Sequence, residues 1–176
     1  AVLDVGFGLG YGLQIMAAKV NKLIGLEVDA RAVDHGRRIF KGHPRIKQVL
    51  LCNGEGIPFK DKSFDVVTCV EVLEHVEDYK VLLLQMVRVS KRLIFITTPN
   101  RRLEYTTWDG KPRNYWHLRE WSYQGLDTIL QRIPDIHIDW NFLNGSWNGP
   151  FEWGTDVSEN TLTLAPALVL DAFEEC

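Results

Sequence analysis

The sequence predicts an α/β protein with one doubly wound, mostly parallel β-sheet and helices on both of its faces. Apolar runs rich in Val, Ile and Leu alternate with amphipathic runs through the first hundred residues, which is the pattern of β-α-β units. A glycine-rich segment directly follows the first apolar run, as in the strand-to-helix turns that bind nucleotides. The 176 residues, 45% hydrophobic and 24% charged, suit a single domain, 1–176, with its own core.

Seven segments are expected to form strands. Five are short, continuous apolar runs, as strands covered on both faces should be: 1–5, 22–28, 46–51, 64–70 and 92–97. Two more, 136–143 and 161–170, are separated by a loop that contains the turn signals Asn144-Gly145 and Asn148-Gly149-Pro150. These last two segments are therefore expected to form an antiparallel pair.

Four segments with apolar residues at helical spacing are expected to form helices: 12–20, 30–40, 78–89 and 122–132. Segment 99–121, between the last strand of the parallel set and the last helix, is polar and rich in aromatic residues, and we expect it to be an insertion. Because residues 1–5 already read as a buried strand with no initiator Met, we expect an N-terminal covering segment to be missing.

Composition excludes several classes of protein. The net charge of −3 selects no polyanionic partner, so nucleic acid is disfavoured as a ligand. The three cysteines have no zinc-type spacing, which favours a reducing, cytoplasmic location. No apolar run reaches the roughly 18 residues of a membrane span, and no secretory signal is present. We therefore expect neither secretion nor a membrane partner.

The segment from Asp4 to Gly10 has the pattern D-x-G-x-G-x-G. Glycine allows the backbone to approach a ligand closely. A dinucleotide site requires G-x-G-x-x-G, but the third position of that pattern is Tyr11 here. A pyrophosphate would be repelled by Asp4, whereas a cofactor with an ammonium and a sulfonium would be attracted. The alternative is a plain tight turn without a ligand.

Glu27 ends the second expected strand, 17 residues after Gly10, where doubly wound sheets place an acid against ribose hydroxyls. Asp29 is a rival for the same role, and a solvated strand-end carboxylate is the alternative for both.

Five segments in order resemble the successive motifs of class I S-adenosylmethionine-dependent methyltransferases, most closely the small-molecule subgroup that includes the ubiquinone-biosynthesis methyltransferases. They are 2–10, 25–29, 53–59, 63–67 and 71–76, which read VLDVGFGLG, GLEVD, NGEGIPF, SFDVV and EVLEHV. This resemblance implies a Rossmann-like, seven-stranded sheet whose last strand is antiparallel. It also implies S-adenosylmethionine as the cofactor and S-adenosylhomocysteine as the product.

The resemblance assigns cofactor-binding residues by motif position. The glycine loop would surround the methionine part, Glu27 and Val28 the ribose, and Asn53 with its neighbours the adenine. The full expected set is Asp4, Gly6, Gly8, Gly10, Glu27, Val28, Asn53, Gly54, Glu55, Val70 and Glu71. Asn53 stands where the family usually has Asp; its amide oxygen can still accept from the adenine amino group, but a bare turn at Asn53-Gly54 is the alternative.

His75 and His117 are the catalytic candidates, because a hydroxyl acceptor benefits from a positioned base. Hydrogen-bonded wall residues are the alternative for both histidines. Together with Glu71 and Glu74 they could also hold a divalent metal, an arrangement that resembles small-RNA 2′-O-methyltransferases and some ubiquinone-pathway enzymes. The use of a metal is left open.

Segment 99–121 is expected to form the acceptor side of the site. It and the following turn contain aromatic residues that offer flat surfaces with polar tips: Tyr105, Trp108, Tyr115, Trp116, Trp121 and Tyr123. They favour a small, partly apolar and even aromatic acceptor, although they could equally cover the edge of the sheet. Trp147 and Trp153 could belong to the same wall or to a homodimer contact.

The leading hypothesis is therefore a small-molecule methyltransferase. The alternatives are a cofactor-binding regulatory or scaffold protein without turnover, a metal-assisted RNA 2′-O-methyltransferase, and a nicotinamide oxidoreductase, which the glycine spacing disfavours.

Overall fold

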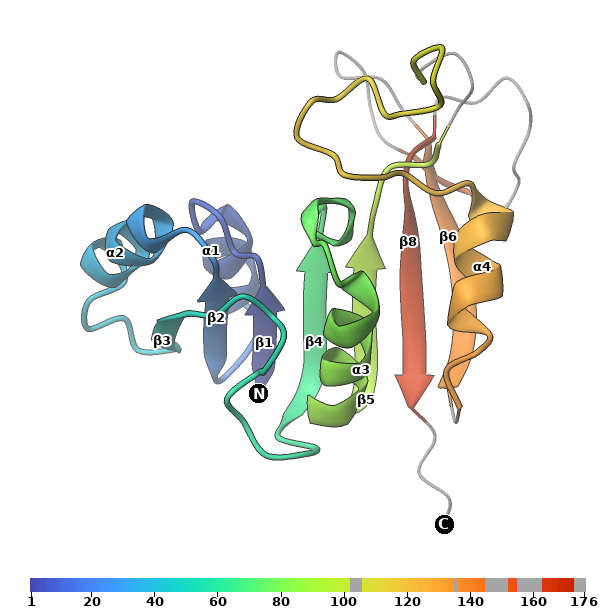
Figure 1. Ribbon diagram of the computed structural model, residues 1–176. Helices are drawn as coiled ribbons and strands as arrows, with labels where there is room; N and C mark the ends of the chain where they lie inside the picture. The colour runs from blue at the N-terminus through green and yellow to red at the C-terminus, as the bar shows by residue number, and fades with distance from the viewer. Residues whose placement is uncertain (102–105, 135, 145–151, 155–162, 173–176) are drawn as a thin grey trace.

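One β-sheet organises the molecule in the computed structural model, which describes residues 1–101, 106–134, 136–144, 152–154 and 163–172, with side chains through Trp140. The strand order is β3-β2-β1-β4-β5-β8-β6-β7 (Figure 1). The order reverses between β1 and β4, which is where ligands bind in open α/β sheets.

Five strands pair in parallel, so the prediction of a mostly parallel sheet is confirmed. Their bounds are β1 Val2–Val5, β2 Leu23–Glu27, β3 Ile46–Leu51, β4 Phe64–Val70 and β5 Ser90–Thr97. Every residue of β1 is buried, because β1 lies between two strands with helices above and below. Its carboxyl end leads directly into the glycine loop.

The far half of the sheet is antiparallel. β8, Thr163–Ala172, lies between β5 and β6, Ile136–Asn144, and runs antiparallel to both, as expected of the last pair of segments. The prediction of seven strands with one antiparallel strand is wrong, because the described residues form eight strands. A short strand within the expected loop, β7, Glu152–Gly154, also pairs antiparallel with β6. Three residues carry too little pattern to predict such a strand.

Four α-helices and one 3₁₀ turn connect the described strands. They are α1 Tyr11–Ala17, α2 Ala30–Ile39, η1 Leu73–His75, α3 Tyr79–Val89 and α4 Tyr123–Leu130. Three helices begin at side chains that accept a hydrogen bond from the first turn, namely Asp29, Asp78 and Ser122. Such caps satisfy backbone N–H groups that have no partner within the helix, which explains why these helices start where they do.

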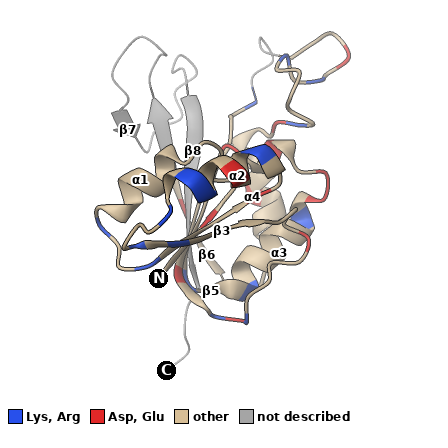
Figure 2. Cartoon of the chain, turned by 90° about the vertical axis from the view of Figure 1, so that its left-hand side faces the viewer, with Lys and Arg blue, Asp and Glu red and all other residues tan. Residues whose placement is uncertain are grey.

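The helices cover both faces of the sheet, as expected. Leu13 of α1 and Val33 of α2 belong to one buried cluster, and Met86 of α3 and Leu126 of α4 belong to another. In Figure 2 α1 and α3 accordingly lie on opposite sides of the sheet. Among the described residues no helix combines the length and the apolar character of a membrane span; the longest, α3, has 11 residues.

Candidate functional site

The loop after β1 has a backbone that glycine alone adopts easily. Gly6, Gly8 and Gly10 have φ angles of +75°, +55° and +91°. A Cβ on Gly6 would lie 2.3 Å from Cγ2 of Val72, so the space there is closed to any side chain. A Cβ on Gly8 would meet nothing within 4 Å. The loop therefore has an open surface at Gly8 and a packed one at Gly6.

Asp4 is a buried carboxylate at the carboxyl end of β1, 5% exposed. It accepts a hydrogen bond of 2.7 Å from the Thr68 hydroxyl. Burial raises its pKa from 3.8 to about 6, the Thr68 hydrogen bond opposes this rise, and the charge of Glu27 adds to it. No ion pair with Asp4 is present among the described residues. A cationic ligand next to this buried carboxylate would stabilise its ionised form.

Glu27 supports the glycine loop from β2. Its Oε2 accepts from the Gly8 N–H at 2.9 Å, and its Oε1 accepts from the N–H groups of Val28 and Asp29 at 2.7 and 3.1 Å. The rival, Asp29, caps α2 and forms an ion pair of 2.9 Å with Arg31. Asp29 is therefore occupied within the protein, and Glu27 remains the acid that faces the loop.

A cavity of about 240 Å³ opens beside this loop at the carboxyl edge of the sheet. Of the residues expected to bind the cofactor or to act in catalysis, it is lined by Gly6, Glu27, Val28, Asn53, Gly54, Glu55 and His75. The remaining expected residues, Asp4, Gly8, Gly10, Val70, Glu71 and His117, do not line it. Seven residues that were predicted from separate sequence motifs therefore line the same cavity.

Sequence reasoning missed seven residues that line the cavity: Val5, Cys52, Val72, Val76, Glu77, Asp78 and Leu82. Val5, Val72 and Val76 lie within quoted motifs, and Cys52 and Glu77 lie directly next to one, so the motifs themselves were the available signal. The sequence around Leu82 contained no such signal, because its spacing indicated only a buried helix face. In the structure its Cδ1 lies 2.9 Å from the position that a Cβ of Gly54 would take.

Asn53 forms a local turn, since its Oδ1 accepts from the Glu55 N–H at 3.2 Å. Gly54 has a φ of +83°. Turn formation is thus the one interaction of the Asn53 side chain among the described residues. Contact with adenine stays a prediction.

Glu71 has a strained backbone with φ +54°, which is rare for residues other than glycine. Thr97 holds it: the Glu71 N–H donates to the Thr97 hydroxyl at 3.1 Å, and that hydroxyl donates to Glu71 Oε1 at 2.7 Å. Although the residue is exposed in part, loss of solvent around the carboxyl raises its pKa to about 7, and the negative charge of Glu74 adds to the rise.

The structure brings the two candidate histidines together. The rings of His75 and His117 pack edge to face with centroids 4.8 Å apart. Nδ1 of His75 donates to the Trp116 carbonyl at 2.8 Å. Nδ1 of His117 donates to Oε1 of Glu120 at 2.6 Å, and its Nε2 accepts from Asn114 at 2.8 Å. These partners place a proton on Nδ1 of each ring, and Nε2 of His117 accepts a hydrogen bond.

Glu74 is fully buried beside the histidines, and burial raises its pKa. Its Oε2 accepts from Thr98 at 3.1 Å, whereas Oε1 has no hydrogen-bond partner in the part of the chain that the structure describes. Oε1 lies 3.9 Å from Nε2 of His75, and ligand atoms of Glu74, His75 and His117 all lie within 4.8 Å of one another. The group has three members; Glu71, included in the expected set, is not one of them.

The aromatic residues of the insertion divide into two sets. Trp121 packs against Tyr79 and Tyr123 against Trp140, with ring centroids 4.9 and 4.7 Å apart, so these cover the sheet. Trp108, Tyr115 and Trp116 are 99%, 88% and 73% exposed. Tyr105 and Trp147 lie outside the described residues, and Trp153 lies outside the described side chains.

Fold and site together define the class: a Rossmann-like α/β domain whose ligand pocket lies at the β1/β4 switch point, with a glycine loop and a strand-end acid. A family model described as "Methyltransferase domain" matches residues 3–93, about half of the chain, and the chain belongs to this family. Curated relatives of this chain are named as S-adenosylmethionine-dependent methyltransferases.

Two curated relatives and one solved structure illustrate the similarity. A probable S-adenosylmethionine-dependent methyltransferase of Mycobacterium tuberculosis is 31% identical over 85% of this chain and 52% of its own length. A ubiquinone biosynthesis O-methyltransferase of Neisseria meningitidis is 28% identical over 79% and 55%. The crystal structure of YcgJ from Bacillus subtilis superposes with a TM-score of 0.73 at 16% identity, covering 99% of this chain and 92% of that one. The chain spans about half the length of the curated relatives it matches.

Proposed function

We propose that this protein transfers a methyl group from S-adenosylmethionine to a small-molecule acceptor. The observation that carries the proposal is Asp4, a buried carboxylate without a cationic partner among the described residues, next to a glycine loop and a cavity. When bound, S-adenosylmethionine supplies an electrophilic methyl group on a sulfonium and an ammonium that Asp4 can balance. A dinucleotide would bring negative phosphates to the same carboxylate instead.

The residues of the chain fit the parts of this cofactor. The glycine loop, Gly6 to Gly10, and Asp4 would hold the methionine part. Glu27 and Val28 would hold the ribose, and Asn53, Gly54 and Glu55 the adenine. Val70 and Glu71 would lie beside the bound cofactor. Support comes from the shared cavity for most of these residues and from the hydrogen bond between Glu27 and the Gly8 N–H.

His117 is the proposed base, with Glu120 as its orienting partner. The His117 side chain is 10% exposed and that of Glu120 is 9% exposed, so their hydrogen bond of 2.6 Å is shielded from solvent. A carboxylate at Nδ1 leaves the lone pair at Nε2, where it can take the proton of an acceptor hydroxyl once Asn114 moves aside. His75 would position this ring through their edge-to-face contact.

The acceptor side is assigned to insertion 99–121, whose described residues 106–121 lie over the carboxyl end of the sheet (Figure 1). Its exposed Trp108, Tyr115 and Trp116 suit a partly apolar or aromatic acceptor. The ubiquinone-pathway relative is named as an O-methyltransferase, which favours a hydroxyl acceptor here. We also propose that residues 1–176 act as one domain. The free thiols of Cys52 and Cys69 support a cytoplasmic location.

A divalent cation is a proposed part of this site. Nδ1 of His75 donates to a carbonyl, so Nε2 is the ring nitrogen that could bind a cation. It lies 3.9 Å from Oε1 of Glu74, a buried carboxylate oxygen without a hydrogen-bond partner among the described residues, and a cation between the two atoms would bind both. One carboxylate oxygen and one imidazole, completed by water, suit Mn²⁺ or Zn²⁺, and His117 of the same group keeps its Nε2 for the role of base.

The proposed activity is tested by incubating the protein with S-adenosylmethionine and a panel of phenols, amines and carboxylic acids, and measuring S-adenosylhomocysteine. We expect turnover on a phenol, and about a hundredfold loss of kcat in His117→Ala with an unchanged cofactor Kd. Cofactor binding without turnover on any acceptor would instead favour a regulatory or scaffold protein. Turnover on small RNA alone would favour the RNA enzyme.

The cation is tested separately by calorimetric titration with Mn²⁺ and with Zn²⁺. We expect one site per chain in the unmodified protein and at least about a tenfold weaker site in Glu74→Gln and in His75→Ala. Glu77→Gln is the matched control, since Glu77 lines the cavity but does not belong to the ligand group. Equal affinity in all four proteins would exclude the proposed ligands.

A further inference from the structure

A second cavity, of about 430 Å³, lies between α2 and β3 and shares no lining residue with the candidate site. Its buried floor consists of Phe40, Ile46 and Val49. The eleven residues that line it include Arg37, Lys41, His43 and Lys47 but no Asp or Glu. We call this cavity the edge groove. Its lining is therefore positive, opposite in sign to the net charge of the whole chain, −3.

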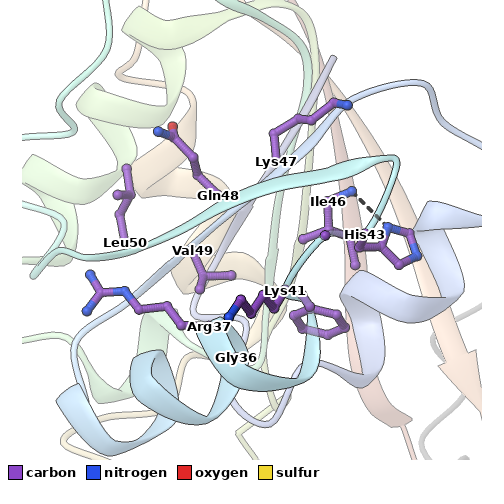
Figure 3. Close-up of a pocket in the computed structure, with 11 residues that line it drawn as sticks. Gly36, Arg37, Lys41, His43, Ile46, Lys47, Gln48, Val49 and Leu50 are labelled. Atoms are coloured by element: carbon purple, nitrogen blue, oxygen red, sulfur yellow. Dashed lines mark hydrogen bonds between the residues drawn. The ribbon is translucent and has the colours of Figure 1, made fainter.

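Some of the polar side chains of the edge groove have no partner among the described residues. The side chains of Lys41 and Gln48 make no hydrogen bond or ion pair there, and that of Arg37 forms only a long, exposed ion pair of 3.3 Å with Asp34. In Figure 3 Arg37 and Lys41 lie on the α2 side of β3, whereas Lys47 and Gln48 extend from its other side. Cationic groups thus flank the strand on both sides.

The main chain of β3 also has unused hydrogen-bonding capacity. β3 is the edge strand of the described sheet and pairs only with β2. The Cys52 N–H donates to the Glu27 carbonyl of β2 at 2.8 Å. Because successive residues of a parallel strand direct their N–H and C=O groups to alternate sides, those of Val49 and Leu51 point away from β2. An exposed strand edge of this kind is a template for another strand.

We propose that the edge groove binds an extended acidic peptide segment of a partner protein, which adds to β3 as a further strand. The main chain of β3 would supply the ladder of hydrogen bonds, and Arg37, Lys41 and Lys47 would select acidic side chains. Nucleic acid fits less well. Its bases need exposed aromatic faces for stacking, whereas Phe40, the aromatic ring that carries the floor, is 7% exposed.

The test uses two fluorescein-labelled peptides with equal charge, Glu-Thr repeated over nine residues and Glu-Pro repeated over nine residues. Proline removes the N–H donors and prevents strand pairing. Fluorescence anisotropy should give a Kd about tenfold or more tighter for the Glu-Thr peptide. The double variant Arg37→Glu, Lys41→Glu should weaken this binding by about tenfold or more, whereas Lys60→Glu, an exposed change outside the groove, should not.

Amide hydrogen exchange of the unmodified protein gives a readout that does not depend on how the variants fold. Exchange of the Val49 and Leu51 amides should slow in the peptide complex, while the Kd for S-adenosylmethionine stays unchanged. Three results would overturn the proposal: no binding of either peptide, equal binding of both without protection of these amides, or tighter binding of a single-stranded oligonucleotide that the same double variant removes.

Discussion

The Thr68 hydroxyl of β4 donates a hydrogen bond of 2.7 Å to the Asp4 carboxylate of β1. The two strands are neighbours, and Asp4 is paired with Thr68 in their register. The hydrogen bond stabilises the ionised form of a carboxyl that burial would otherwise keep neutral. The Asp4 carboxylate is thereby mostly ionised at neutral pH, at the switch point of the sheet, where we propose that it attracts the cationic cofactor.

The affinity for S-adenosylmethionine is predicted to depend on pH through Asp4. Its pKa of about 6 in the ligand-free protein means that the carboxyl is mostly ionised at pH 7 and mostly protonated at pH 5. Because the ionised form attracts the cationic cofactor, Kd should rise about tenfold between pH 7 and pH 5. Calorimetric titrations at half-unit intervals measure this. Thr68→Val should move the midpoint to higher pH, because the opposing hydrogen bond is lost. A Kd that is independent of pH in both proteins would show that Asp4 does not interact with the bound cofactor.

Asp4→Asn is predicted to stabilise the ligand-free protein while it impairs cofactor binding. The folded-state pKa lies above the unfolded value of 3.8, so this group lowers the free energy of unfolding as pH rises from about 4 to about 6. The shift corresponds to about 3 kcal/mol at most, and urea unfolding at pH 7 should show a gain of about 1–3 kcal/mol in Asp4→Asn. At pH 4 the gain should vanish. A loss of stability at pH 7 would mean that the carboxylate has a compensating partner.

Gly6→Ala is predicted to damage the site beyond the cost of its backbone conformation, because its Cβ would collide with Val72. Gly42→Ala is the matched control: its φ of +76° equals that of Gly6 within a degree, but nothing lies within 4 Å of its Cβ position. Gly42→Ala should cost about 1 kcal/mol of folding free energy and leave cofactor affinity unchanged. Gly6→Ala should cost more and lose cofactor affinity. Equal effects of the two changes would show that Val72 gives way.

Glu120→Gln is predicted to lower kcat without changing the Kd of the cofactor, because the neutral amide no longer stabilises a protonated His117. The pH profile of kcat should also change, because a carboxylate attracts a charged imidazole and a neutral amide does not. Glu77→Gln serves as the control, because Glu77 lines the cavity but takes no part in this hydrogen bond. An unchanged kcat and pH profile in Glu120→Gln would show that the hydrogen bond between His117 and Glu120 has only a structural role.

The parallel half of the fold was predictable because each of its elements has a strong local pattern. The bounds expected for β3 and β4 agree with the structure at both ends. These strands are flanked by helices whose caps, such as Asp78, are visible in the sequence. β7 was missed because it pairs over only three residues, and that pairing depends on β6, remote in sequence.

Site residues that belong to a sequence motif were predictable. Those that depend on contacts between segments remote in sequence were not. Gly6, Glu27 and Gly54 came from motifs and line one cavity. The orphan Oε1 of Glu74 was not predictable, because its burial depends on packing of the insertion over β4, for example through the Leu118 N–H, which donates to the Glu74 carbonyl at 3.0 Å. Nothing in the local sequence around Lys41 or Gln48 indicated the edge groove either.

The central claim is that the loop from Asp4 to Gly10 binds S-adenosylmethionine, and calorimetric titration of the ligand-free protein tests it most directly. We predict one site for S-adenosylmethionine, no measurable binding of NAD, and loss of about a hundredfold or more in affinity in Asp4→Ala and in Gly8→Val, whose φ of +55° a branched side chain does not tolerate. Unchanged affinity for S-adenosylmethionine in Gly8→Val, or binding of NAD in its place, would contradict the account.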